Sequence, residues 1–218
     1  MPTTHTISPG HHAHDVDIDD TFDFLNTDDT EDGVPADKLP TLDAALDWFV
    51  GRGVIHGEGA EGVRIRTSAR PELADVELER VLAVRSALRE VTQAIVEDRA
   101  PDRAALDTVN RALHARQIIE LVPATDGCSV DHRHVGDPVD DALARLADPL
   151  VAELTSGQPE RIRQCGAHDC WWFFYDTSRT QRRRWCDMAT CGNRAKAARY
   201  RARARSGDVP SIEIAPQP

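Results

Sequence analysis

Aromatic residues are scarce in this 218-residue sequence, at 5% of the chain, and no apolar run reaches membrane-spanning length. The first twenty residues lack the apolar centre of a secretory leader, so we expect a cytoplasmic protein. Residues 1–157 contain no nucleophile elbow, HExxH sequence or phosphate-binding loop. Their only candidates for an enzyme site are His114, Asp131, His132 and His134, and no spacing unites them. These absences argue against a membrane protein and against an enzyme.

Four of the five cysteines lie close together, with the spacing C-x4-C, fifteen residues, C-x4-C. They are Cys165, Cys170, Cys186 and Cys191. Two close pairs separated by an insert of hairpin length suit a tetrahedral metal, since each pair supplies two thiolates from one turn. Two disulfides are the alternative, which a reducing compartment disfavours. His168 also lies between the first two cysteines, but four thiolates already complete a closed site. We therefore predict one structural Zn²⁺ with these four ligands.

Charge and aromatic residues are distributed unevenly along the chain. Six of the eleven aromatic residues fall within residues 171–185, where they can supply a small metal module with buried area. The net charge is −11, yet residues 161–205 hold twelve Arg or Lys and three Asp, a charge of +9. The remainder of the chain therefore carries −20. An acidic body with a strongly basic end predicts a polyanionic partner for that end.

The basic end is predicted to finish in a helix over about residues 193–205, because alanine and arginine are good helix formers. Arginines at every second position would form two stripes on it, 199/203 and 201/205, and only alanines and Tyr200 would be apolar. Such a helix suits phosphates on both walls of a groove. The run 182–184 could balance the zinc thiolates or contact phosphates. The predicted nucleic-acid contacts are Arg182, Arg183, Arg184, Arg194, Lys196, Arg199, Arg201, Arg203 and Arg205. A solvated or protein-binding basic face is the alternative.

The preceding residues predict a mainly helical domain with a few short strands. After a His-rich disordered leader, 1–20, we expect a short strand or an entry into the domain at 21–27 and a loop at 28–40. A turn at 57–62 should precede a strand at 63–67, and Cys128 should be a packed thiol. Apolar periodicity and turn residues predict four helices and a hairpin. The helices are expected over 42–50, 72–98, from Pro101 to about 113, and 138–154, and the hairpin strands over 117–122 and 129–135.

Several segments together resemble the CGNR zinc-finger family over residues 161–203. They are Cys191-Gly192-Asn193-Arg194, which spells CGNR, the cysteines Cys165 and Cys170, the segment 172–179, and the segment 183–188. Members usually carry an N-terminal ABATE domain, and FDFLNT at 22–27 is similar to its opening. The family is inferred to contain stress-induced bacterial transcription regulators. The resemblance thus implies zinc binding by Cys165, Cys170, Cys186 and Cys191, and DNA binding.

The expected fold class is α+β. It comprises a disordered leader (1–20), an ABATE-like domain (21–157), a finger made of a hairpin and a basic helix (158–206), and a tail (207–218). Gly192 should allow a tight turn after the last ligand, and Asn193 should cap the helix. We expect DNA as the partner of the finger, with ligand sensing or homodimerisation by the first domain. The alternative is an interaction module whose basic helix docks on an acidic protein, including the chain's own acidic domain.

Overall fold

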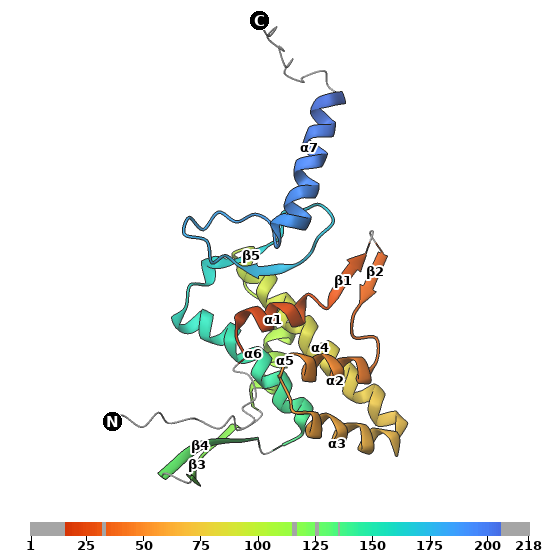
Figure 1. The fold of residues 1–218 in the computed structure, drawn as a ribbon, viewed down its shortest axis with the longest axis vertical. Coiled ribbons are helices and arrows are strands. Elements are labelled where there is room, and N and C mark those ends of the chain that lie inside the picture. Colours follow the sequence, from red (N-terminus) through yellow and green to blue (C-terminus); the bar gives the residue numbers. More distant parts are fainter. Residues whose placement is uncertain (1–15, 32–33, 115–116, 125–126, 135, 206–218) are drawn as a thin grey trace, which may run out of the picture.

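A computed structural model provides the fold, and the description covers residues 16–31, 34–114, 117–124, 127–134 and 136–205. Helices dominate, and the strands form three separate antiparallel pairs (Figure 1). The helices are α1 (Ile18–Leu25), α2 (Leu42–Gly51), α3 (Gly57–Ser68), α4 (Pro71–Val96), α5 (Arg103–Leu113), α6 (Pro138–Ser156) and α7 (Asn193–Arg205). The pairs are β1 (Asp28–Glu31) with β2 (Val34–Asp37), β3 (Gln117–Ala124) with β4 (Gly127–His134), and β5 (Ile162–Gln164) with β6 (Phe173–Tyr175). The α+β class is confirmed, including the final hairpin and basic helix.

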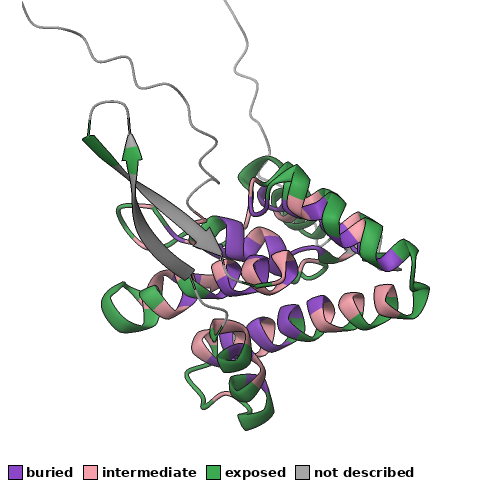
Figure 2. Ribbon diagram, turned by 90° about the horizontal axis from the view of Figure 1, so that it is seen from below, coloured by how far each residue is buried: buried purple, intermediate pink, exposed green. Residues whose placement is uncertain are grey.

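The core surrounds α4, which packs against α1, α2, α3, α5 and α6. Buried residues follow one side of the long helices and exposed residues the other (Figure 2). On α4 the buried face includes Val81, Leu88 and Val91, as the helical spacing predicts. Arg85 lies on the same face, and its guanidinium donates to Asp37 and Thr27, which compensates the buried charge. Among the described residues, no helix is both long and apolar enough to cross a bilayer.

The first helix, α1, corrects the strand predicted at 21–27 and the end of the disordered leader predicted at 1–20. The rest of that leader, residues 1–15, and the predicted tail, 207–218, lie outside the described residues. Asp17 accepts hydrogen bonds from the backbone N–H groups of Asp19 and Asp20, and the Asp20 carboxylate accepts one from the backbone N–H of Asp17. This reciprocal capping starts the helix at Ile18. Phe22, Phe24 and Leu25 are all buried, so their alternation reflects a short helix enclosed on several sides.

Helix α3 replaces the turn and strand predicted between residues 57 and 67. Ala60, Val63 and Thr67 are its buried residues, and their spacing places them on one helical face. Gly59 faces α6, since a Cβ atom at this position would lie in ordinary van der Waals contact, 3.4 Å from Cβ of Pro138. Packing thus offsets the low helix propensity of glycine, about 1 kcal/mol per residue.

The two N-terminal hairpins differ in how well they were predicted. The predicted loop at 28–40 contains β1 and β2, whereas the longer hairpin, β3 with β4, is confirmed. Residues 125 and 126 of its turn lie outside the described part of the chain. Cys128 is exposed, so the packed thiol is wrong, because a two-stranded ribbon offers a side chain little enclosure. The side chains of residues 131–134 are outside the description, and His114 is exposed.

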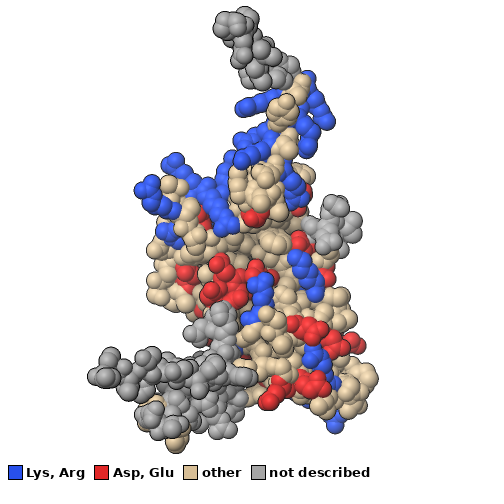
Figure 3. All heavy atoms as spheres, in the orientation of Figure 1, with Lys and Arg blue, Asp and Glu red and all other residues tan. Residues whose placement is uncertain are grey.

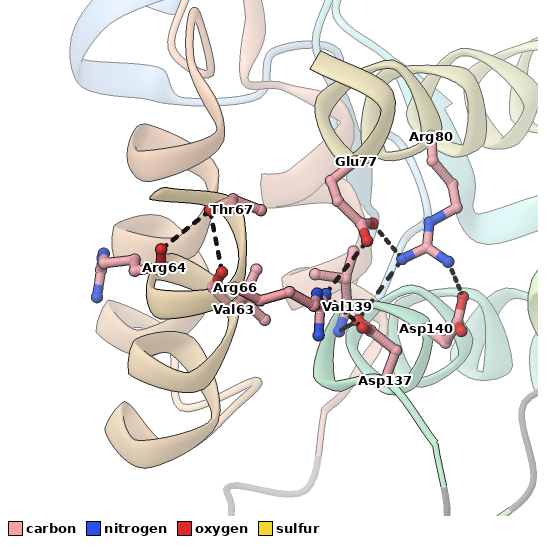
Figure 4. Close-up of polar contacts among 9 residues, drawn as sticks. All are labelled: Val63, Arg64, Arg66, Thr67, Glu77, Arg80, Asp137, Val139 and Asp140. Carbon is pink, nitrogen blue, oxygen red and sulfur yellow. Dashed lines mark hydrogen bonds and ion pairs between the residues drawn. The ribbon is translucent and has the colours of Figure 1, made fainter. Parts of the chain in front are cut away.

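Acidic and basic side chains gather on different parts of the surface. Figure 3 shows acidic side chains over the helical body and basic side chains over α7 and the loops beneath it. Part of the acidic charge is compensated locally in an ion-pair network that joins α3, α4 and α6 (Figure 4). In this network Asp137 pairs with Arg66 and Arg80, and Arg80 also pairs with Glu77 and Asp140. Asp137 additionally caps α6 by accepting from the backbone N–H of Val139 at 2.8 Å.

Candidate metal centre and basic interface

Backbone hydrogen bonds bring the two cysteine pairs together. Cys165 follows β5 directly, and its N–H donates to the carbonyl of Trp172 at 2.8 Å, which extends the pairing with β6. The N–H of Gly166 donates to the carbonyl of Arg184 at 2.8 Å. This bond draws the second cysteine segment across the first turn. A Cβ atom on Gly166 would lie only 3.2 Å from that carbonyl oxygen, so the close approach favours glycine.

The four cysteine sulfurs form one cluster, in which every Sγ lies within 4.8 Å of the others. The Sγ atoms of Cys170 and Cys186 are 3.7 Å apart, and those of Cys186 and Cys191 are 3.6 Å apart. Disulfide sulfurs would be about 2.05 Å apart, so all four cysteines are free thiols. Four sulfurs at about 2.3 Å from a tetrahedral Zn²⁺ lie about 3.8 Å from each other. The cluster therefore fits one four-coordinate zinc.

The electrostatics of the cluster also call for a cation. The hydrogen bond from Cys186 lowers the pKa of the Cys170 thiol to about 5, while the same contact raises the pKa of Cys186. Burial raises the pKa of Cys165. Some thiols can thus ionise only at the expense of others, because neighbouring thiolates repel one another. A divalent cation removes this conflict and lets all four ionise, which gives a closed site with a structural role.

Nitrogen donors from the backbone and from Arg194 contact the sulfurs. The backbone N–H of Cys186 donates to Sγ of Cys165 at 3.4 Å. Nη2 of Arg194 donates to Sγ of Cys191 at 3.2 Å, and Nη1 of the same guanidinium donates to Asp169 at 2.8 Å. These groups form an outer layer of hydrogen bonds around the thiolates, of the kind that orients metal ligands.

The last ligand lies in a π-helical turn, Met188–Gly192, that leads directly into α7. Asp187 caps this turn by accepting from the N–H of Thr190 at 2.7 Å, so the cap predicted at Asn193 is wrong. Asn193 is already helical and donates to the carbonyl of Ala189. Gly192 packs against Met188 and Trp185, where a Cβ atom would clash with Sδ of Met188. Its small size thus serves close packing and not the predicted tight turn.

Arginine side chains hold the loop between the two cysteine pairs in place by hydrogen bonds to backbone carbonyls. Arg161 donates to the carbonyl of Asp176 at 2.8 Å, and Arg163 donates to that of Gln181 at 2.9 Å. Arg183 donates to the carbonyls of Trp185 and Cys186, and its guanidinium lies 4.6 Å from the ring centre of Phe174. Arg183 was predicted to contact nucleic acid, but its guanidinium makes its contacts within the finger.

Asp176, which the sequence reasoning did not single out, is a buried anchor for the same loop. Its carboxylate accepts from the backbone N–H groups of Ser178 and Arg183, at 3.0 and 2.9 Å. Arg184 lies over the ring of Trp185 at 5.1 Å, while Arg182 is exposed. Of the three consecutive arginines, Arg182 and Arg184 thus remain the better placed for an external partner.

The finger is joined tightly to the helical body through Asn26, another residue that sequence reasoning missed. Its side-chain amide donates to the carbonyl of Phe173 and accepts from the N–H of Phe173, both at 2.9 Å. Arg89 donates to the carbonyls of Leu25 and Trp171, and its guanidinium lies 5.1 Å from the ring centre of Phe173. Phe173 and Ile162 belong to the main hydrophobic core, so the core continues across residue 158.

Helix α7 carries most of the remaining predicted nucleic-acid contacts. It has no buried residue and points away from the helical body (Figures 1 and 3). Its basic residues beyond the first turn are Lys196, Arg199, Arg201, Arg203 and Arg205, and all are exposed. Within the described chain, no hydrogen bond or ion pair links the side chains of Lys196, Arg199 or Arg201 to the body. The structure thus brings the four cysteines together and leaves these cations on the outside.

Family models match the chain in the order that the resemblance implies. The CGNR zinc-finger model matches residues 161–204. The ABATE model, described as "Putative stress-induced transcription regulator", matches residues 21–157. A search of curated proteins finds no match. Neither matched family is described as an enzyme family. The chain therefore belongs to the ABATE family, and the four cysteines of its CGNR zinc finger are positioned to bind one structural zinc.

Proposed function

We propose that this protein is a bacterial, cytoplasmic transcription regulator that binds DNA through α7 of its zinc finger. In this proposal Cys165, Cys170, Cys186 and Cys191 coordinate one Zn²⁺, which fixes the base of α7 on the finger. The metal supplies no open coordination position, so its contribution is to hold structure. The finger then presents an arginine-rich helix to the phosphates of a duplex.

The observation that carries the proposal is the exposed, cationic α7. A helix without a buried residue contributes nothing to core packing, so its function lies on its exposed surface. Arg199 and Arg203 lie about one turn apart on one side, and Arg201 and Arg205 lie on nearly the opposite side. A major groove about 12 Å wide admits a helix and has phosphates along both walls. Two opposed stripes of arginine match that arrangement.

Arg182 and Arg184 extend the proposed contact beyond the helix. Both are exposed in the loop before the second cysteine pair. Figure 3 shows further basic side chains on the loops beside the base of α7. We assign these loop cations to phosphates flanking the groove that α7 enters. Contacts of this kind position a protein on DNA and strengthen binding without reading sequence.

The helical domain, residues 21–157, is proposed to sense a small-molecule ligand or to form a homodimer. It is joined to the finger through Asn26 and Arg89, so a change in α1 or α4 would move the finger. Under this proposal the two predicted domains, 21–157 and 158–206, act as one unit on DNA. The acidic surface of the body would be repelled by phosphates, which leaves the basic end as the contact face.

A second candidate function is a zinc-stabilised interaction module whose α7 docks on an acidic protein. The acidic side chains over the helical body favour it, because a second copy of the chain could provide that surface. In this case the basic helix would drive salt-sensitive self-association and not DNA binding.

The test compares charge-removing variants of the zinc-loaded full chain in binding to a labelled duplex. The double variant Arg199→Gln with Arg203→Gln removes one stripe of α7. Arg103→Gln removes one positive charge from an exposed position on α5, away from α7, and serves as the control. We expect the double variant to weaken binding at least tenfold at low salt, and the control to bind like the parent.

Equal DNA affinity of the parent and the double variant would contradict the proposal. Light scattering on the same samples addresses the second function. Dimers of the parent that dissociate in the double variant, together with no DNA binding, would favour the interaction module.

A further inference from the structure

We propose that Arg194 is a positioning residue of the zinc site, which retains the metal and aims α7, and not a phosphate contact. The sequence pattern groups Arg194 with the cations of the helix that follows. The geometry separates it from them, because its guanidinium turns back onto the cysteine cluster. This inference rests on the zinc site and does not require DNA binding.

The first step is the contact with sulfur. Nη2 of Arg194 donates to Sγ of Cys191 at 3.2 Å. Four thiolates around Zn²⁺ carry a formal charge of −2, and an arginine at one sulfur offsets part of it. Hydrogen bonds from a charged donor to an anionic acceptor are among the stronger ones in proteins.

The second step is the link between the two cysteine pairs. Nη1 of Arg194 donates to Oδ2 of Asp169, which directly precedes Cys170 in the first pair. Arg194 itself follows the second pair and lies in the first turn of α7. One guanidinium therefore ties the first pair, the second pair and the start of the helix together. The planar fork of arginine can serve two acceptors at once, whereas a lysine ammonium cannot reproduce that geometry.

The third step is a comparison of the two contacts. The side chains of Arg194 and Asp169 are 55% and 49% exposed, so their ion pair alone adds little stability. Cys191 is buried, and the donor to its sulfur is shielded on that side. The contact with Cys191 therefore carries most of the effect, and Asp169 mainly orients the guanidinium. The neighbouring Lys196 and Arg199 have no such contact among the described residues.

The experiment measures zinc release from the full chain to a chromogenic chelator in excess. The variants are Arg194→Gln, which loses the charge and one donor fork, and Arg194→Lys, which keeps the charge only. Arg199→Gln is the matched control on the same helix. Loss of an outer-layer hydrogen bond to a metal ligand typically weakens binding 10- to 100-fold. We expect release at least tenfold faster from Arg194→Gln, an intermediate rate from Arg194→Lys, and the parental rate from Arg199→Gln.

A second variant, Asp169→Asn, keeps the inference testable if Arg194→Gln does not fold. Its side chain is half exposed, and we expect release a few-fold faster, because the guanidinium loses its orientation. The Co²⁺-substituted proteins provide an independent readout. Their thiolate-to-cobalt absorption should shift in Arg194→Gln and not in Arg199→Gln.

Parental release from Arg194→Gln would overturn the inference, and so would equal acceleration by Arg199→Gln, which would indicate a general charge effect. Failure of the DNA proposal would leave these rates unchanged, so the two proposals fail separately.

Discussion

Truncation of Asn26 should uncouple the finger from the helical body. In Asn26→Ala the N–H and carbonyl of Phe173 both lose their hydrogen-bond partner, at a position where Asn26 is 5% exposed and Phe173 is 2% exposed. A buried polar group left without a partner costs about 1–3 kcal/mol. Two such groups predict a loss of about 3 kcal/mol in the free energy of unfolding. That is a large share of the 5–15 kcal/mol typical of a domain.

Urea unfolding of the zinc-loaded chain, followed by tryptophan fluorescence and circular dichroism, measures this loss. Asn110→Ala is the matched control, because Asn110 is exposed on α5 and has no side-chain bond within the described chain. A loss below about 0.5 kcal/mol in Asn26→Ala, or a loss equal to that of Asn110→Ala, would refute the role of this junction.

Three further perturbations have defined outcomes. Asp137→Ala removes the cap of α6 and the pairs with Arg66 and Arg80 (Figure 4), so urea unfolding should show a loss of about 1–2 kcal/mol, and none for exposed Asp107→Ala. Burial raises the pKa of Asp141 to about 6, so the folded protein holds this proton more tightly than the unfolded chain. Stability should therefore fall by about 1 kcal/mol from pH 5 to 7.5, and a comparison with Asp141→Asn, which lacks this fall, isolates the effect. Chelation of zinc should lower the thermal midpoint and change tryptophan fluorescence, and an unchanged midpoint would contradict a structural metal.

Local patterns predicted the parts of the fold that local interactions determine. The cysteine spacing indicated the metal cluster, because two turns and an insert suffice to bring four thiols together. The composition of residues 193–205 predicted α7, since alanine and arginine favour a helix without tertiary support. Helix α4 followed from its apolar period, since its buried residues recur at helical spacing.

Tertiary contacts decided the elements that were predicted wrongly. In α1, Ile18, Phe22 and Leu25 have helical spacing, but Phe24 is also buried in the core, and the alternation of Phe22 with Phe24 indicated a strand. Three glycines in α3 suggested a turn, and the contact of Gly59 with Pro138 of another helix is invisible to a local pattern. The Asn26–Phe173 bonds join residues 147 positions apart, and no spacing rule reaches that far.

The sequence also did not show which arginines of the basic end bond within the finger and which face outward. Arg161, Arg163, Arg183 and Arg194 look equivalent to their neighbours in sequence, yet their guanidinium groups bond within the finger. Composition counts charge and does not indicate which cations remain for a partner. The contact with DNA stays a prediction for Arg182, Arg184 and the outer residues of α7.

The decisive measurement for the DNA interface is the affinity of the zinc-loaded full chain for a random duplex at 50 and 200 mM salt. Each phosphate contact contributes about 0.9 to the slope of log affinity against log salt. Five contacts from Lys196, Arg199, Arg201, Arg203 and Arg205 predict a loss of roughly 500-fold over this range. A chain with these five residues changed to Gln should lose most of that slope. Absence of binding at 50 mM salt, or an equal slope in the two chains, would contradict the assignment of α7 to DNA.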